Sequence, residues 1–431
     1  MSILVVFLIL DTSIIKIYYF SFNQSPVGWR VILFVLISSV YFASLYLISK
    51  FVKQRSEHIR NRKILHINIL HKTAVVSQYL LTATISAIIF QIVISSGYNS
   101  ALLIIATWIS YTVAILMIGT LAKRFFSWFK SDRNPTVLLY GLSSAMLAIN
   151  ATFTLLFVTF LIRNVPDYVR PRIGVASPFF SFGPLTDILN LGYVISSIIS
   201  FMLWWIATVS VLRRYSEKSK KRYWFILSIP LLYFLIQFQP LFLNLFSSFL
   251  VSQPVLFSIV YQLVFTVSKP VGGILFGIAF WFITRKLGSN NVARNYMVLS
   301  AYGLVLIFVS NQAIVLVTGP YPPFGLATTS FMGLSSYLLL VGIYSSAISV
   351  AEDSKIRQPI RKTAIEEAKF LHSIGMAQME DELQRRVITI VKEQHDVLTY
   401  QTGIEPSLNE NELKHYLSET IQEIKRSQIK Y

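Results

Sequence analysis

The 431-residue chain contains no cysteine. This absence excludes disulfides, thiolate nucleophiles, iron–sulfur clusters and zinc sites with cysteine ligands. Acidic residues are scarce as well, because residues 1–350 contain only Asp11, Glu57, Asp132, Asp167, Asp187 and Glu217. Only Asp11 falls within a long apolar stretch. Facing carboxylates for an intramembrane aspartyl protease are therefore missing, and a proton-coupled transporter would have Asp11 as its only buried acid.

Other catalytic patterns are also missing from the sequence. The histidines of residues 1–350 are His58, His66 and His71, and the last two are five positions apart, which is a poor spacing for metal ligands. We expect them on a solvated loop. No metalloprotease pattern and no Walker-A loop occurs, which excludes an ATP-driven pump within this chain. The sequence predicts a protein that is not an enzyme and uses no metal or cofactor.

The composition is that of a membrane protein. Hydrophobic residues make up 54% of the chain and charged residues 13%, with a mean hydropathy of +0.59, whereas soluble domains carry about 25% charged residues. Crossing a bilayer takes roughly 20 apolar helical residues. Continuous apolar runs favour helices over the alternating strands of a barrel. The expected fold is an all-α polytopic helical membrane protein, with the lipid bilayer as its main partner.

Ten apolar segments are candidate transmembrane helices. The first segment carries Asp11 and Lys16, and we interpret it as a marginal helix held by packing, with a functional Asp11 as the alternative. It has no preceding basic residue and no small-residue cleavage site, which argues against a removable signal peptide. If it does not span, nine helices remain and the N-terminus lies outside. The segments are Ile3–Phe22, Trp29–Ser49, Thr73–Ser95, Ala101–Leu121, Thr136–Ile162, Asp187–Leu212, Tyr223–Phe246, Val255–Thr284, Asn295–Val317 and Leu326–Val350.

The distribution of basic residues predicts the orientation. The net charge is +18, and residues 1–350 hold 26 basic against 6 acidic residues. Four alternate connections between the segments contain 20 Lys and Arg, whereas the opposite side has 4, namely Arg30, Arg163, Arg170 and Arg172. Basic loops stay in the cytoplasm and are attracted by anionic lipid. We therefore expect a multi-pass protein of the cell membrane with both termini cytoplasmic, and no binding of nucleic acid.

Polar residues at similar depth in three consecutive segments suggest a ligand site. Polar groups inside a bilayer are costly and often functional. The candidate ligand-binding residues are Lys269, Gln237, Gln239, Asn311 and Gln312. Counted from the cytoplasmic end, these residues lie roughly 21–26 Å into their segments at 1.5 Å per residue, which is the outer half of the membrane.

The eighth segment is long and is interrupted by Lys269-Pro270-Val271-Gly272-Gly273. Proline and glycine break helices, and broken helices at membrane depth line the cavities of many transporters. One interpretation is an outward-facing pocket where Lys269 meets an anionic or carbonyl group. The alternative is an interfacial helix, with Lys269 reaching the headgroups and the glycines allowing close packing. The third segment has no proline or glycine, which weakens an inverted-repeat transporter.

Two external connections are rich in proline and aromatic residues, Arg163–Leu185 and Gly319–Phe324. We interpret them as loops seated in the membrane interface. A cap over an outer pocket is the alternative.

The chain changes to a soluble composition at residue 351. The expected domains are a transmembrane part, residues 1–350, and a cytoplasmic tail of amphipathic helices, residues 351–431. A first helix is predicted to stop at Gly375, and Met376, Met379, Leu383, Val387 and Ile390 then follow the a/d pattern of a coiled coil. A last helix carries Leu413, Leu417, Ile421 and Ile424. Such helices would pack on one another, on a second copy of the chain, or on a cytoplasmic partner.

The run YSSAISVAEDSKIRQPIRKTAIEEAKFLHSIGMAQMEDELQRRV, Tyr344–Val387, is similar to the tails of uncharacterised archaeal multi-span membrane proteins. The resemblance covers the tail and the last spans and implies a membrane location without an assigned activity. The pair His395-Asp396 also resembles the phosphoacceptor of sensor histidine kinases, but no ATP-binding domain follows it.

Taken together, the sequence favours a sensor, receptor or scaffold in which the membrane part is coupled to the tail. The alternative is a facilitator or channel-like transporter of a small solute.

Overall fold

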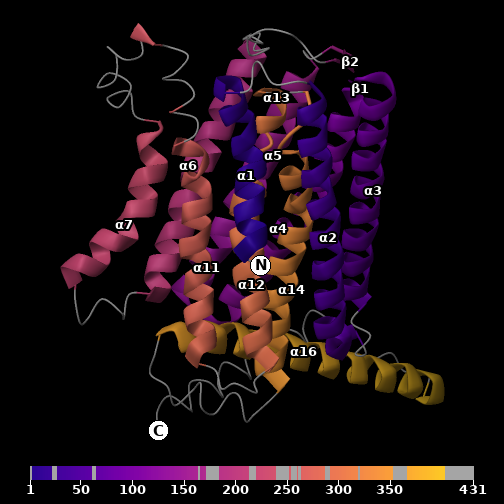
Figure 1. Cartoon of the computed structure of the whole chain (residues 1–431). Helices are drawn as coiled ribbons and strands as arrows, with labels where there is room; N and C mark the ends of the chain where they lie inside the picture. Colours follow the sequence, from indigo (N-terminus) through magenta and orange to yellow (C-terminus); the bar gives the residue numbers. More distant parts are fainter. Residues whose placement is uncertain are drawn as a thin grey trace.

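The computed structural model describes residues 2–21, 27–60, 65–163, 166–170, 184–212, 220–238, 252–253, 260, 264–286, 292–318, 321–352 and 366–402. These residues form a bundle of long helices with one helix across its lower end (Figure 1). The helices are α1 (Ser2–Ser21), α2 (Val27–Arg60), α3 (Leu65–Ser95), α4 (Ala101–Asp132), α5 (Pro135–Ile162), α6 (Pro184–Leu212), α7 (Lys220–Ile236), α11 (Ser268–Lys286), α12 (Val292–Ser310), α13 (Val315–Thr318), α14 (Leu326–Glu352) and α16 (Glu366–Thr402).

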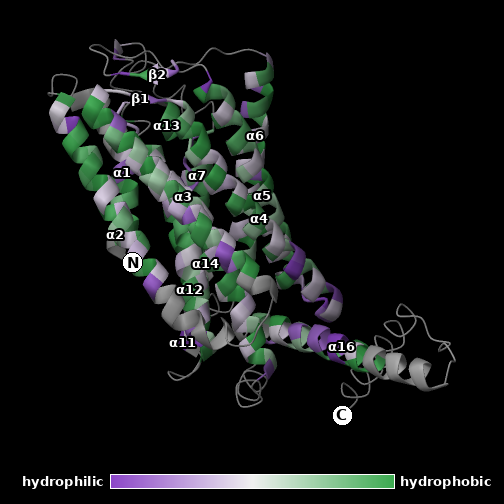
Figure 2. Cartoon of the chain, turned by 90° about the vertical axis from the view of Figure 1, so that its right-hand side faces the viewer, coloured by the Kyte–Doolittle hydropathy of each residue, from purple (hydrophilic) through white to green (hydrophobic). Residues whose placement is uncertain are grey.

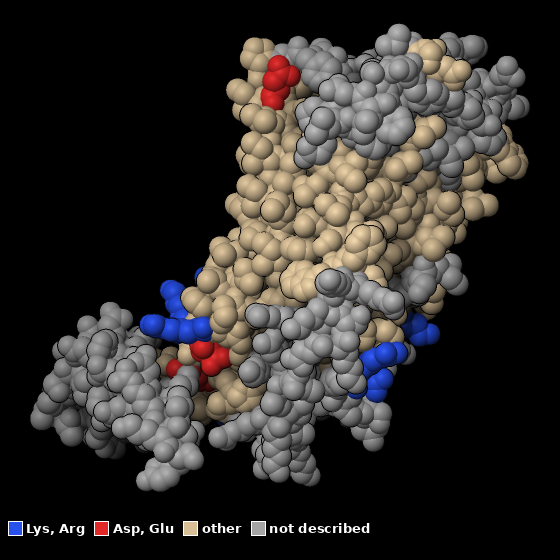
Figure 3. Space-filling model, turned by 90° about the vertical axis from the view of Figure 1, so that its left-hand side faces the viewer, with Lys and Arg blue, Asp and Glu red and all other residues tan. Residues whose placement is uncertain are grey.

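Eight described segments are long and apolar enough to cross a membrane, which confirms the all-α polytopic membrane fold. They are α2, α3, α4, α5, α6, the segment Val264–Arg285 that includes α11, the segment Val292–Val317 that includes α12, and α14. The first and seventh predicted spans appear as shorter apolar helical stretches, Leu4–Ser13 in α1 and Trp224–Ile236 in α7. Hydrophobic residues predominate along the helices of the bundle (Figure 2). In Figure 3 the visible Lys and Arg lie low on the molecule, below a broad uncharged belt.

Helix α14 is the centre of the bundle. Of the eight spans it is the most enclosed, because 89% of its most apolar 18-residue stretch is buried inside the protein. Small residues let neighbouring backbones approach closely, as is usual for membrane helices. A Cβ at Gly342 would lie 2.7 Å from the Ser300 nitrogen of α12, and one at Gly303 of α12 would lie 2.6 Å from the Leu339 nitrogen. Glycine at these two positions therefore permits the tight α12–α14 contact.

Asp11 links α1 to the start of α14. Its Oδ1 accepts a hydrogen bond from the Gly325 N–H at 2.9 Å, and its Oδ2 accepts from the Thr328 N–H at 3.1 Å and the Thr328 hydroxyl at 2.7 Å. The first N–H groups of a helix lack partners within the helix and attract negative charge. These bonds favour the packing interpretation of the first segment, because the carboxylate caps α14 from another helix.

A short antiparallel ladder ties together two connections at the upper end. Strand β1 (Tyr98–Asn99) pairs with β2 (Tyr168–Val169), in the register Tyr98↔Val169 and Asn99↔Tyr168. A Cβ at Gly97 would lie 2.6 Å from the Val169 carbonyl oxygen, so this turn needs glycine. The ladder holds the α3–α4 turn against the connection that follows α5. Residues 171–183 of the same external connection lie outside the described residues.

Two predictions about the first basic connection need correction. The sequence predicts a basic cytoplasmic connection, Lys50–Lys72, between the second and third segments. Helix α2 extends down to Arg60 and α3 begins at Leu65, so most of this connection is helical. His71 does not lie on a solvated loop, because its Nδ1 is 2.9 Å from the Tyr337 hydroxyl of α14. Long helices whose ends continue beyond the bilayer cannot be told from loops by hydropathy alone.

Candidate functional site

A set of buried and half-buried polar side chains, which we call the inner polar group, joins five helices. It consists of Tyr111 of α4, Asn150 of α5, Tyr193 of α6, Lys269 of α11 and Asn311 directly after α12. Tyr111, Asn150 and Tyr193 lie 9 to 12 residues from the upper ends of their helices, or roughly 14–18 Å at 1.5 Å per residue. The group therefore lies at membrane depth, where an unpaired polar atom is costly.

The Asn311 side chain is the centre of the inner polar group. Its Oδ1 accepts a hydrogen bond from the Tyr111 hydroxyl at 3.1 Å, and its Nδ2 donates to the Asn150 Oδ1 at 2.9 Å. The Asn150 Nδ2 donates in turn to the Ser196 hydroxyl at 3.1 Å and the Tyr193 carbonyl at 3.3 Å. Both amides are thus fixed by partners on other helices, so α4, α5, α6 and α12 are held in one arrangement.

Lys269 brings a positive charge to this group. Its Nζ donates to the Tyr193 hydroxyl at 3.0 Å and to the Asn311 backbone carbonyl at 3.4 Å. An ammonium has three N–H donors, and these two oxygens are its hydrogen-bond acceptors within the described ranges. No carboxylate there forms an ion pair with it. The arrangement is suited to an anionic or carbonyl group on the remaining donor, because opposite charge is strongly favoured in a low-dielectric site.

Two backbone breaks lie near Lys269. The break predicted at Lys269–Gly273 is wrong, because these residues all lie within α11. The helix is interrupted just before them instead, where a turn at Val267 separates the helical residues Val264–Thr266 from α11. Pro270 lies in the first turn of α11, where its missing N–H costs little. The second break follows Ser310, where residues 311–314 leave the helix before α13 begins. The ninth predicted span is therefore not one continuous helix.

Each break supplies a polar partner for the other. The Gln312 Nε2 donates to the Thr266 carbonyl at 3.3 Å, on the far side of the Val267 turn. Lys269 donates to the carbonyl of Asn311. Irregular backbone at membrane depth is tolerated only where its polar groups find partners in protein or water. The structure thus brings Lys269, Asn311 and Gln312 together in one region, and their binding of a ligand stays a prediction.

The remaining candidate residues have other positions. Gln237 directly follows α7, and its Nε2 donates to the Phe234 carbonyl of that helix at 2.8 Å. Gln239 lies outside the described residues. The glycines after Pro270 serve close packing. A Cβ at Gly272 would lie 2.2 Å from the Phe201 ring of α6, and one at Gly273 would lie 2.6 Å from Phe308 of α12. That part of the packing interpretation is confirmed.

A second feature lies at the lower end, where α16 crosses the bundle (Figure 1). We call residues Phe370–Asp381 of α16 the docking segment. Phe370, Leu371, Ile374 and Ala377 are fully or almost fully buried. The Phe370 ring lies 5.0 Å from Tyr140 of α5, 6.2 Å from Phe280 of α11 and 6.3 Å from Phe125 of α4, measured between centroids. This apolar stripe therefore closes the lower end of the core.

Polar contacts continue along the docking segment. The Asn134 amide donates to the Ser373 hydroxyl at 2.8 Å, and the Trp128 indole N–H donates to the Gln378 Oε1 at 3.2 Å. Further on, Ser127 donates to the Asp381 Oδ2 at 3.3 Å, and Ser131 donates to Glu380. The predicted helix end at Gly375 is wrong, because α16 runs through it. A Cβ there would lie 2.4 Å from Val350, so this glycine lets α16 approach α14.

Comparison with protein families, curated proteins and solved structures gives no match. The resemblance of the tail to archaeal membrane proteins stays a prediction. The site rests on this chain's own geometry.

Tyr111, Asn150 and Tyr193 were missed as site residues by sequence reasoning. Asn150 had a usable signal, because it is an amide in the middle of the apolar fifth segment. The two tyrosines had none, since tyrosine is common in membrane helices and only the fold brings these hydroxyls to Asn311 and Lys269.

Proposed function

We propose that the protein is a non-enzymatic membrane sensor or receptor in which a ligand beside Lys269 changes the docking of α16. The observation that carries this proposal is that the same helices contribute to the inner polar group and contact the docking segment of α16. Helix α4 carries Tyr111 above and Trp128 below, α5 carries Asn150 and Tyr140, and α11 carries Lys269 and Phe280. A shift of one of these helices would act on both ends.

The coupling needs a ligand that favours one arrangement over another. A ligand shifts an equilibrium only by the difference in its affinity for the two states. An anionic group that binds the remaining donor of Lys269 would pull the ammonium toward itself and weaken its bonds to the Tyr193 hydroxyl and the Asn311 carbonyl. Releasing either contact loosens α6 or the end of α12, and α12 packs along the central helix α14 that also contacts the docking segment.

The test measures docking of α16 when Lys269 is replaced. Because the chain has no cysteine, spin labels can be placed at Asp132→Cys on α4 and Thr389→Cys on α16, both exposed positions. Lys269→Met leaves two acceptors without a donor, and we expect a shifted or broadened label distance. Lys123→Met, an exposed lysine of α4 outside the inner polar group, is the control. The proposal fails if all three proteins give the same distance distribution.

A second test concerns the output. Deleting residues 351–431 should abolish any signalling or partner recruitment by the protein. Unchanged signalling in the truncated chain would rule out the tail as the readout.

The alternative proposal is a facilitator or channel-like transporter of a small, anionic solute. It is favoured by the two adjoining breaks at Val267 and residues 311–314, since broken helices at membrane depth are typical of transporter sites. Uptake of small anions into reconstituted vesicles tests it, with Lys269→Met as the variant. Equal flux through parent and variant would remove Lys269 from the path, and no flux through either would reject transport.

We also propose that the end bearing α16 faces the cytoplasm and that the membrane is the cell membrane. The support is the positive-inside rule together with the low position of the visible basic residues (Figure 3). In intact cells a membrane-impermeant thiol reagent should label Asn99→Cys of β1 and leave Thr389→Cys unlabelled. The reverse pattern would invert the topology.

A further inference from the structure

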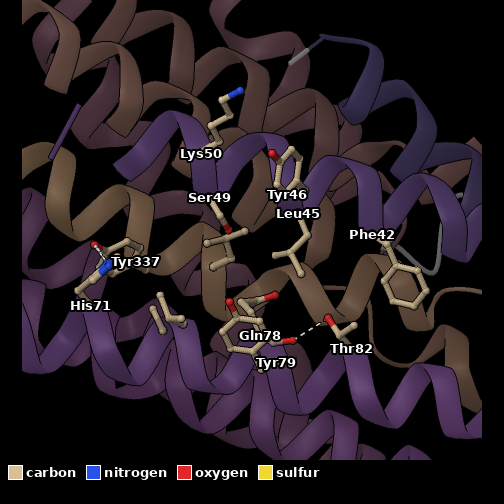
Figure 4. Close-up of a pocket in the computed structure, with 13 residues that line it drawn as sticks. Phe42, Leu45, Tyr46, Ser49, Lys50, His71, Gln78, Tyr79, Thr82 and Tyr337 are labelled. Carbon is tan, nitrogen blue, oxygen red and sulfur yellow. Dashed lines mark hydrogen bonds between the residues drawn. The ribbon is translucent and has the colours of Figure 1, made fainter. Parts of the chain in front are cut away.

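A lateral groove between α2, α3 and α14 is separate from the inner polar group. Its cavity has a volume of about 650 Å³, within the range of roughly 300–1,000 Å³ typical of small-ligand sites. The apolar part of its lining includes Phe42, Leu45, Val75 and Leu334. Figure 4 shows lining side chains from α2 facing those from α3 and α14 across the groove.

The groove also has a polar part. The His71 Nδ1 lies 2.9 Å from the Tyr337 hydroxyl, which joins α3 to α14. Gln78 is 95% buried, and its Oε1 accepts a hydrogen bond from the Tyr41 hydroxyl at 3.2 Å. The Gln78 Nε2 is buried and has no hydrogen-bond partner among the described residues. An unpaired buried donor costs about 1–3 kcal/mol, so the lining is suited to an occupant with polar atoms.

The opening of the groove faces the bilayer. Tyr46 of α2 and Tyr79 of α3 line it and are 67% and 73% exposed. Helix α2 is the least enclosed of the eight spans, because only 28% of its most apolar 18-residue stretch is buried inside the protein. Residues on such a surface meet lipid rather than water. The occupant therefore comes from the membrane.

A basic residue, Lys50, lies at the opening of the groove. Lys50 is the last residue of the apolar span Val27–Lys50 within α2; it lines the groove and is exposed. In Figure 4 its ammonium points away from Gln78, which leaves it at the rim and not in the interior. The sequence continues with Lys53 and Arg55. Basic residues directly beyond a membrane helix attract anionic lipid headgroups.

We propose that this groove binds one anionic phospholipid from the bilayer. One of its acyl chains lies along Phe42, Leu45 and Leu334, an ester carbonyl accepts from the Gln78 Nε2, and its phosphate lies beside Lys50. The apolar lining accounts for the chain, and the basic rim accounts for the charge of the headgroup.

The test is native mass spectrometry of the full chain in detergent, with added phosphatidylglycerol or phosphatidylcholine of the same chain length. We expect one phosphatidylglycerol to be retained in preference to phosphatidylcholine. Lys50→Gln should weaken retention about fivefold, the effect of one interfacial basic residue, whereas Lys123→Gln should not. Val75→Trp fills the groove and should abolish retention. The adjacent Val76→Trp is its control, because Val76 is 55% exposed and lies outside the lining.

Three outcomes overturn the proposal. Equal retention of the two lipids removes the role of charge. Equal retention by the Val75→Trp and Val76→Trp variants places the lipid elsewhere. A dimer that Val75→Trp dissociates would make a second copy of the chain the occupant. Only variants that are monodisperse are compared. Loss of lipid by a monodisperse Val75→Trp protein then reflects the filled groove and not unfolding.

Discussion

Replacing Phe370 with alanine is the most direct test of whether the docking segment is a stable part of the bundle. The Phe370 ring is fully buried against aromatic residues of three helices, α4, α5 and α11. Truncating such a ring in a core costs about 3–5 kcal/mol. If this whole free energy comes from the docking of α16, its loss shifts the equilibrium between docked and released α16. The shift is roughly one hundred- to several thousandfold, at tenfold per 1.4 kcal/mol.

Hydrogen exchange of the amides in Phe370–Asp381 measures this shift in the reconstituted protein. We expect Phe370→Ala to reduce protection of these amides by at least one hundredfold, while amides of α12 stay protected. Leu383→Ala is the matched control, because Leu383 is on the same helix but 48% exposed. Equal protection in both variants would show that burial of this ring does not hold α16, and would refute the reasoning.

Two further predictions concern carboxylates. Burial raises the pKa of Asp381 above its ordinary value of 3.8, although the hydrogen bond from Ser127 and the charge of Arg124 lower it. The docked state then holds the proton more tightly, so docking is strongest below pH 3.8 and weakens as the pH rises through the docked pKa. Spin-label distances measured below pH 3.8 and at pH 7.5 should differ in the parent and not in Asp381→Asn; the same pH response in both would disprove it. Asp11→Ala removes the cap of α14 and should lower the unfolding free energy by about 1–2 kcal/mol. Thermal unfolding checks this against Leu10→Ala, 48% exposed on the same helix, and an equal loss in the two variants would deny Asp11 its capping role.

The membrane fold was predictable because the bilayer leaves few choices. A segment of about 20 apolar residues must form its hydrogen bonds internally, so each such segment reads as a helix whatever its neighbours are. This is why the predicted spans Ala101–Leu121 and Leu326–Val350 begin at the first residues of α4 and α14. The second also ends within one turn of the end of α14, whereas α4 continues to Asp132. The break after Ser310 was not predictable, since no proline or glycine marks it. It depends on partners for the freed carbonyls, which come from Lys269 and other distant positions.

The tail shows the same division. The apolar spacing of α16 predicted an amphipathic helix. The sequence could not say what covers its apolar stripe, and Gly375 was misread as a helix end. In the fold that glycine faces Val350, and the stripe is covered by the bundle itself over the docking segment. Pairing with a second copy stays a prediction for the exposed half with Leu383 and Ile390.

Composition and the spacing of apolar residues alone determined the membrane class of this protein and eight of its ten predicted spans. Local patterns carry that information because each span satisfies its own backbone. Only the tertiary structure decided that Asn150, Tyr111 and Tyr193 meet Lys269 and Asn311, that Asp11 caps α14, and that a groove opens between α2, α3 and α14. These features are contacts between helices far apart in the chain, which no local period encodes.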